Sequence, residues 1–294
     1  MSGQGEIRMV VRDVLGREQV IVQQYYAART LLRHGLDDFS YEFGKQRLNF
    51  TSANNDYGQW MLAATRRHGV TDRLTAEVHG EIRPGSQSLG LAATALWPSV
   101  GVIDVALATS HSGAGGGALA MLGFEHQAPR FNVGVRTQVT SARFDQLGLA
   151  PGFPAPLRQS NAHAGWNDPR FGSLGLGYLS LARRGQVESR LASLSYNRNL
   201  LMNWNLNASG FKTLQGRSEY SLSITLSHAF GQRGSAIISA SRNKGANSAI
   251  AQYQQNSPIG SGVGYRVLAS RDSNTRVEGA LNTKHALNTI RAYK

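Results

Sequence analysis

The sequence predicts an all-β protein: a short β-hairpin followed by part of a transmembrane antiparallel β-barrel. Three observations predict this class, namely strict alternation of apolar and polar residues, long strands, and a polar face of small uncharged side chains. Charged residues make up only 17% of the chain, against roughly 25% in soluble domains. Something other than charge must therefore cover much of the surface.

The alternation recurs from about residue 38 to the end of the chain. In the three clearest segments the apolar residues are Phe131, Val133, Val135 and Val139; Tyr220, Leu222, Ile224 and Leu226; and Val263, Tyr265 and Val267. Successive side chains of a strand point to opposite faces, so each segment has one apolar and one polar face. Strands of about 9 to 12 residues suit a tilted membrane strand, whereas soluble strands average about 5 to 6 residues.

The polar positions of these segments hold mostly Ser, Thr, Asn, Gln, Gly and Arg, which are typical of a water-filled lumen. Arginine at the lipid midplane costs about 2 to 4 kcal/mol, so the strand arginines are expected to face the lumen or to lie at the rim. We therefore predict a pore lined by the polar face. The candidate pore-lining residues are Asn132, Arg136, Gln138, Asn205, Ser221, Ser223, Thr225 and Arg266.

Two other regions differ from this pattern. In residues 1–36, Ile7, Met9 and Val11 predict a short strand, residues 13–16 a turn, and Val20 and Val22 a return strand. This small hairpin resembles part of a soluble sandwich, with the barrel following over residues 37–294. Residues 149–169 contain several prolines and little alternation, which predicts a long loop.

The sequence offers little sign of enzyme chemistry. Its net charge is +13, but the basic residues are dispersed without a Lys/Arg-rich run, which disfavours a nucleic-acid partner. The absence of cysteine excludes disulfides and thiolate metal sites, and the eight histidines show no short ligand spacing. We expect no enzyme activity, metal or cofactor. Ser110, His111 and Asp145 leave one alternative open, a hydrolase site near the barrel rim.

Five segments that follow one another carry a family resemblance: Ser2-Gly3-Gln4-Gly5-Glu6-Ile7, Gln24-Tyr25-Tyr26-Ala27, Leu31-Leu32-Arg33-His34-Gly35-Leu36, Phe39-Ser40-Tyr41-Glu42-Phe43-Gly44 and Arg66-Arg67-His68-Gly69-Val70-Thr71-Asp72-Arg73-Leu74-Thr75. In this order the first four resemble the plug-to-barrel junction of the outer membrane usher proteins of the fimbrial chaperone–usher pathway, and the fifth resembles a turn between barrel strands of the same family. Gln24 and His34 depart from the family, which often has proline at the first position and proline or glutamate at the second.

The resemblance implies a function and a set of partners. Residues 1–36 would be the C-terminal part of the plug domain, and residues 37–294 part of the barrel wall. The protein would sit in the outer membrane of a Gram-negative bacterium. It would receive pilus subunits from periplasmic chaperone–subunit complexes, polymerise them by donor-strand exchange and secrete the fibre. Outer-membrane lipid and lipopolysaccharide would surround it, and rim arginines among Arg136, Arg190, Arg242 and Arg266 would meet lipopolysaccharide phosphate.

The start of the sequence has no basic and apolar segment typical of a secretory signal, so we expect an internal fragment of a longer usher. Two alternatives remain. A passive porin-like or other outer-membrane transport barrel shares the strand pattern, but it lacks the plug-to-barrel junction. A soluble all-β adhesin would bury its apolar faces against each other and would partition into the soluble fraction.

Overall fold

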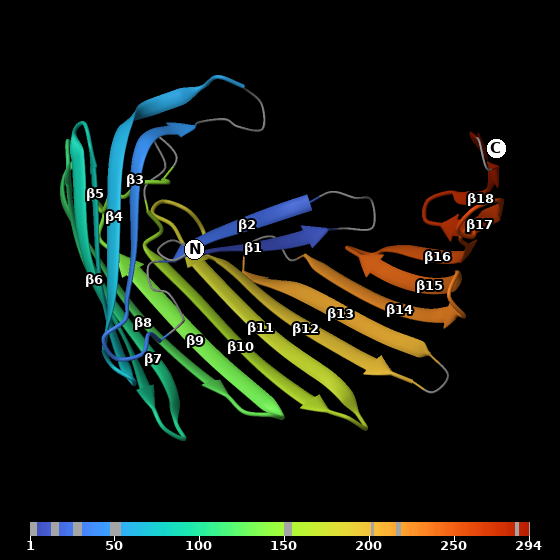
Figure 1. The fold of residues 1–294 in the computed structure, drawn as a ribbon, viewed down its shortest axis with the longest axis horizontal. Coiled ribbons are helices and arrows are strands. Elements are labelled where there is room, and N and C mark those ends of the chain that lie inside the picture. The colour runs from blue at the N-terminus through green and yellow to red at the C-terminus, as the bar shows by residue number, and fades with distance from the viewer. Residues whose placement is uncertain are drawn as a thin grey trace. The chain divides into compact units, whose positions relative to one another are not determined.

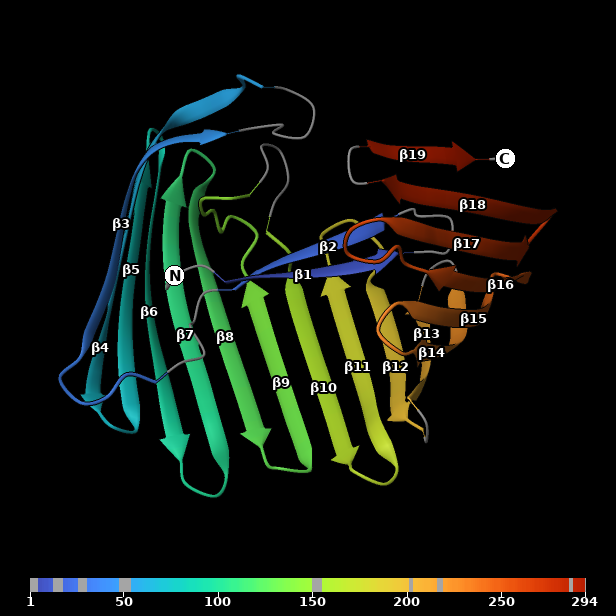
Figure 2. The same cartoon turned by 45° about the vertical axis from the view of Figure 1, so that its right-hand side comes forward.

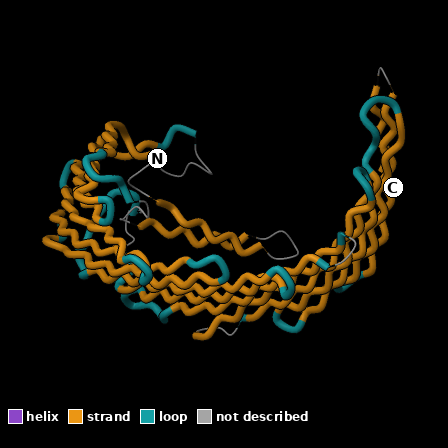
Figure 3. Tube along the Cα trace, turned by 60° about the horizontal axis from the view of Figure 1, so that its bottom comes forward, coloured by secondary structure: helices purple, strands orange, loops and turns teal. Residues whose placement is uncertain are grey.

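The computed structural model describes the backbone of residues 5–12, 18–25, 31–47, 54–149, 155–200, 203–215, 219–285 and 288–293, and side chains only between residues 31 and 284 of these ranges. The regular elements in these ranges are β-strands joined by turns and loops (Figure 3). The described residues contain no helix that is long and apolar enough to cross a membrane.

The first two strands form a separate two-stranded sheet. β1 (Gly5–Arg12) and β2 (Glu18–Tyr25) pair antiparallel, with Met9 opposite Ile21. This pairing confirms the predicted hairpin in the backbone. The turn expected at residues 13–16 lies outside the described residues.

The following strands belong to a second, larger antiparallel sheet (Figures 1 and 2). From β3 to β18 each strand has 10 to 15 residues, which confirms the prediction of long strands. Their bounds are β3 (Asp37–Arg47), β4 (Tyr57–Thr71), β5 (Leu74–Arg83), β6 (Ser86–Trp97), β7 (Gly101–Ser112), β8 (Gly115–Gln127), β9 (Phe131–Thr140), β10 (Arg158–Asp168), β11 (Gly172–Ala182), β12 (Ser189–Asn199), β13 (Trp204–Gln215), β14 (Tyr220–Phe230), β15 (Gly234–Asn243), β16 (Ala246–Gln255), β17 (Gly262–Arg271), β18 (Thr275–His285) and β19 (Asn288–Tyr293).

The chain divides into two compact units. Unit 1 comprises residues 1–128, 132–163 and 178–190, and unit 2 comprises residues 129–131, 164–177 and 191–294. Each strand from β3 to β9 pairs antiparallel with its chain neighbour. The strands from β13 to β19 do the same.

One predicted element is wrong. The loop expected over residues 149–169 is interrupted by strand β10 (Arg158–Asp168). The prolines lie only at positions 151, 154, 156 and 169, outside the strand, so they leave its backbone donors free to pair. The alternate positions of β10 include Ser160, Ala162 and Ala164, whose small side chains conceal the period of two.

Burial in unit 1 is the inverse of that in a soluble protein. Leu91 opposes Leu107 in the pairing of β6 with β7, and both are exposed, at 61% and 67%. On the opposite face of the sheet, Arg67 and Asp104 are buried, each at 2%. A soluble fold would bury the leucines and expose the charges. An exposed apolar sheet face of this kind requires an apolar environment.

Unit 2 exposes one apolar face in the same way. The strand register places Leu222, Ile224 and Ile238 on a single face, and each is more than half exposed. The alternate residues of β14, among them Ser223 and Thr225, occupy the other face. Both units therefore present a continuous apolar surface on one side and a polar surface on the other, opposite to the arrangement of a soluble sandwich.

We predict that Ile224→Arg destabilises the full chain in lipid vesicles by about 2 to 4 kcal/mol, because it places a guanidinium in the apolar band. Thr225→Arg is the matched control, since the neighbouring residue on the same strand faces the polar side. Denaturant titration of both variants in lipid measures the difference. An equal or greater loss for Thr225→Arg would contradict the assignment of the faces.

Candidate functional site

In unit 2 the strand register brings five candidate pore-lining residues onto one face. Ser223 lies opposite Ser209 on β13, and Asn205 shares with Ser209 the same face of that strand. Ser221 and Thr225 alternate with apolar residues on β14. Arg266 on β17 pairs with Gln254 on β16, which is on this face, so Arg266 is on the same face. The alternation therefore grouped these residues correctly, although their position in a pore stays a prediction.

Hydroxyl groups on this face bond to one another across the strands. The Oγ atoms of Ser209 and Ser223 are 2.8 Å apart, and those of Ser241 and Ser248 are 2.7 Å apart. Thr225 Oγ1 lies 3.0 Å from Ser239 Oγ. Within the described strands β13 to β16 this face carries no charged residue, and Phe211, Ile237 and Ile250 are its large apolar members. Over these four strands the surface is mostly hydrophilic and uncharged, and charged residues return on the face from Arg266 on β17 onward.

The polar face of unit 1 is instead charged and largely buried. Arg136, predicted as pore-lining, is 8% exposed, and its Nη2 atom donates to Asp104 Oδ2 at 3.0 Å. Thr94 Oγ1 donates to the other oxygen of Asp104 at 2.8 Å. Asn132 and Gln138 share this face of β9, the first exposed and the second half-buried. These two remain candidates.

A second charged group lies on the same face and was not predicted. Arg67 Nη1 donates to Asp38 at 3.2 Å, and its Nε atom lies 3.4 Å from Glu77. Farther along, His79 Nε2 lies 2.9 Å from Glu81 Oε1, and His79 Nδ1 lies 2.6 Å from Thr65 Oγ1. Burying charge is costly unless it is paired, so these pairings are what hold the charges on the face.

The loop between β9 and β10 folds onto this charged face. Arg83 Nη2 donates to both oxygens of Asp145, at 2.8 and 2.7 Å, and Ser86 donates to one of them at 2.6 Å. The Asp145 backbone N–H donates to Ser110 Oγ at 2.9 Å, and the Leu147 N–H donates to Glu81 at 2.7 Å. These contacts fix the described part of the loop, residues 141–149, against the sheet.

An apolar contact completes the attachment of the loop. Phe144 is 3% exposed and packs with Ala106, Leu119 and Met121. A Cβ atom at Gly117 would lie 2.3 Å from the Phe144 Cα atom, so the strand beneath requires glycine there. This supplies a structural reason for the glycine at position 117.

Two carboxylates in loops of unit 1 have lowered pKa values. Burial raises the pKa of Asp145, but the hydrogen bonds from Ser86 and Arg83 outweigh it, and the net pKa lies below the usual 3.8. The hydrogen bond from Arg190, with others from Ser180 and Arg158, lowers the pKa of Glu188 to about 2. Since both folded-state values are depressed, their bonds stabilise the fold at neutral pH and are lost as the pH falls through these values.

The hydrolase alternative finds no support in this geometry. Ser110 shares the polar face with Ser88, its partner on β6, whereas His111 is the next residue and points to the other face. The Ser110 hydroxyl is engaged with the Asp145 backbone. In the part of the chain that the structure describes, no three His, Asp or Glu side chains gather as metal ligands would.

Two of the segments that carry the family resemblance, residues 31–36 and 66–75, contact each other. Gly35 N–H donates to Gly69 O at 2.8 Å, and Gly69 N–H donates to Leu36 O at 2.9 Å. His34 contacts the same turn, with its backbone N–H donating to Asp72 at 3.0 Å. A Cβ atom at Gly69 would lie only 2.0 Å from Arg33 O. The segment before β3 is thus fixed to the end of β4 by a close backbone contact that only glycine permits.

We predict that Gly69→Ala detaches the segment before β3, because the added methyl cannot coexist with the Arg33 carbonyl. The expected result is faster amide hydrogen exchange at Gly35 and Leu36, by about tenfold or more for a loss of at least one hydrogen bond. Gly44→Ala on β3 is the control, since a methyl group added there would have no atom within 4 Å. Unchanged exchange in Gly69→Ala would contradict the contact.

We also predict that Asp145→Ala frees the loop over residues 141–149. Removing this carboxylate leaves Arg83 without its partner, at a cost of about 1 to 3 kcal/mol. Trypsin cleavage after Arg143, which is exposed, should then accelerate about tenfold or more. Asp168→Ala, at the end of β10 in unit 2, serves as the control and should leave this cleavage rate unchanged. An unaltered rate in Asp145→Ala would show that the loop is held by other contacts.

Solved structures resemble this chain, although no protein-family model and no curated protein matches it. The chain is similar to the P pilus usher (PapC) translocation pore, with a TM-score of 0.71 and 13% identity over 99% of this chain and 63% of that chain. It is similar to a chain of the E. coli P pilus tip assembly intermediate PapC-PapD-PapK-PapG, with a TM-score of 0.74 and 13% identity over 99% of this chain and 39% of that chain. A crystal structure of the usher PapC translocation pore gives a TM-score of 0.62 and 12% identity over 96% of this chain and 66% of that chain.

This chain therefore has the fold of an usher translocation pore, and it spans less than two thirds of the length of each of these chains. The predicted all-β class, with an antiparallel barrel-type sheet after a short hairpin, is confirmed. The resemblance expected from the sequence is confirmed at the level of the fold.

Proposed function

We propose that this chain forms part of the wall of an outer-membrane secretion channel of the usher type. The observation that carries the proposal is the inverted burial of both units, in which large apolar side chains are exposed on one face while polar side chains fill the other. Such a sheet is stable only where lipid covers its apolar face. The usher-pore fold connects this membrane wall to secretion.

In this proposal the polar faces line the lumen. The eight candidate residues are assigned to it, with Asn205, Ser223 and Thr225 in the uncharged surface of unit 2 and Arg136 in the charged surface of unit 1. The part of this wall without charge, over β13 to β16, forms few strong contacts, which suits the passage of a folded protein. The loop over residues 141–149 narrows the lumen where it covers the charged surface.

The proposed cargo is a pilus subunit delivered by a periplasmic chaperone. One of the similar structures is an assembly intermediate that contains PapD, PapK and PapG together with PapC. By analogy, this chain would serve complexes of a chaperone with its subunits, and donor-strand exchange would supply the free energy of polymerisation without a nucleotide. Residues 1–36 would be the C-terminal part of the plug, and residues 37–294 part of the barrel wall in the outer membrane of a Gram-negative cell. No enzymatic step is assigned to the chain.

We predict that single cysteines at the seven candidate positions other than the buried Arg136 react with a membrane-impermeant maleimide in outer membranes containing the chain. The protein has no native cysteine, so each label reports one site. Cysteines at Leu91, Leu107 and Ile224 are the matched controls and should stay unlabelled, because lipid covers them. Labelling of the three controls with protection of the candidates would reverse the faces and refute the proposal.

A second measurement separates an usher from a passive porin. Photo-crosslinking groups at Ser223 and Thr225 should capture a pilus subunit when the chain is expressed with its chaperone and subunits, and groups at Leu222 and Ile224 should not. A passive porin would conduct small ions and give no crosslink at any of the four positions. That outcome would leave the membrane wall intact and remove the secretion function.

A further inference from the structure

The apolar face of unit 2 ends in two arginines. Arg242, near the end of β15, lies opposite Leu222 on β14 and Asn247 on β16. Arg271, the last residue of β17, lies opposite Ala249 on β16. The register thus places both guanidinium groups on the lipid-type face, at the same end of their strands. Each is exposed.

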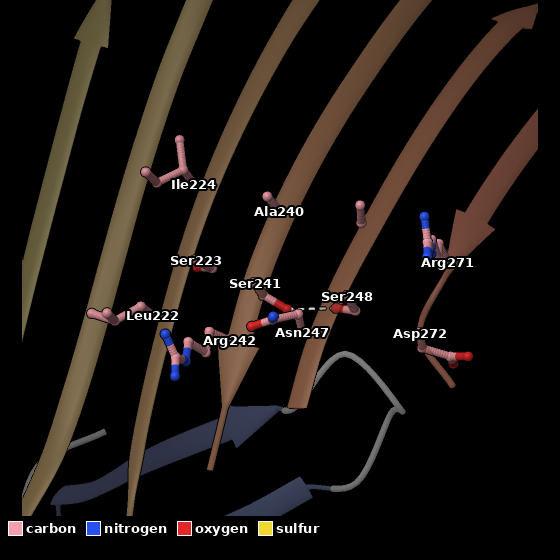
Figure 4. A pocket seen from close by; sticks show the side chains of 11 residues that line it. Leu222, Ser223, Ile224, Ala240, Ser241, Arg242, Asn247, Ser248, Arg271 and Asp272 are labelled. Atoms are coloured by element: carbon pink, nitrogen blue, oxygen red, sulfur yellow. Dashed lines mark hydrogen bonds between the residues drawn. The ribbon is translucent and has the colours of Figure 1, made fainter. Parts of the chain in front are cut away.

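The two arginines border one shallow hollow of about 730 Å³ (Figure 4). Leu222, Ile224 and Ala240 form its apolar part, and Asn247 adds an amide beside Arg242. The hollow therefore combines a cationic rim with an apolar floor. This combination fits an amphiphile with an anionic headgroup and acyl chains, and it fits a free anion less well.

The charges around the hollow leave both guanidinium groups available. Neither Arg242 nor Arg271 forms an ion pair with any residue that the structure describes. Asp272 also borders the hollow, but its carboxylate accepts hydrogen bonds from the Asn274 backbone and the Ser273 hydroxyl, at 2.9 and 3.3 Å. Nearby Lys244 pairs with Glu219.

The opposite end of the same face carries an aromatic row. The rings of Trp204 and His228 are in tilted contact, with centroids 4.5 Å apart, and the row continues through Phe230, Tyr253 and Tyr265. Aromatic rings of this kind mark a membrane–water boundary. The apolar residues between the two ends, such as Ile224 and Ile238, then span the hydrocarbon region, and the arginines lie at the second boundary.

We propose that Arg242 and Arg271 each bind a phosphate of a bisphosphorylated outer-membrane glycolipid, lipopolysaccharide, and that its acyl chains lie along Leu222 and Ile224. This inference rests on the proposed membrane function. Arginine holds phosphate through two parallel N–H donors. Because β16 separates the two arginines, a lipid with two phosphates fits them better than a lipid with one. The site would anchor unit 2 at a fixed depth in the membrane.

The test measures binding of purified lipid A to the full chain in mild detergent, by native mass spectrometry across a lipid titration. In the double variant R242Q/R271Q we expect affinity for bisphosphorylated lipid A to fall about tenfold or more, since at least one charged contact is lost. Arg233→Gln, in a turn at the aromatic end, is the matched control and should change affinity by less than about twofold. Circular dichroism and heat-modified gel mobility confirm that each variant folds.

Three outcomes bear on the proposal. Loss of lipid A binding in the double variant, with dephosphorylated lipid A binding weakly to the unaltered chain, supports it. Equal affinity for phosphatidylglycerol, lost in the same variant, would assign the arginines to phospholipid and overturn the glycolipid assignment. Unchanged binding in the double variant would remove the site. If cysteine at Ile224 is protected from maleimide while binding is unchanged, the site fails and the membrane function stands.

Discussion

The period of two in the strands, fixed in register by antiparallel pairing, is the constraint on which the rest of this structure depends. It places Leu91 and Leu107 on one face and Asp104 on the other. A slip of one residue would move every apolar side chain to the polar face. Because backbone donors and acceptors are satisfied within the sheet, the apolar face can meet lipid without exposing unpaired peptide groups. Fold and membrane function thus follow from the same pairing.

The polar groups of the two polar faces find hydrogen-bond and ion-pair partners in different ways. This difference explains why the loop over residues 141–149 lies on the face of unit 1. In unit 1 buried charges are paired across strands, as Arg136 is with Asp104, and residues of the loop complete the set through Asp145 and Leu147. A buried carboxylate such as Glu81 needs several donors, and the loop supplies one of them. The loop is therefore a structural part of the charged surface as well as a constriction of the proposed lumen.

Much of the fold could be predicted from local sequence, and most of the charged site could not. Alternation predicted exposed Val133 and Val135 correctly, because a period of two is a property of each strand alone. Asp104 and Arg136 are separated by 32 residues, and only the register of β7, β8 and β9 makes them neighbours. Strand β10 was missed because flanking prolines dominate that segment and its small side chains hide the alternation.

The contrast between hydroxyl and charged surfaces also bears on secretion. On the polar face of unit 2, Ser209 bonds to Ser223 and Thr225 bonds to Ser239, so the hydroxyls already have partners within the wall. A passing subunit would gain little by replacing these bonds, and it would lose little when it leaves them. Charged side chains would hold a cargo more strongly. The opposite face needs strong anchoring, and in the proposed arrangement aromatic rings such as Trp204 and the rim arginines would provide it at the two ends of the face. A wall that binds the membrane tightly and its cargo weakly requires different side chains on its two faces.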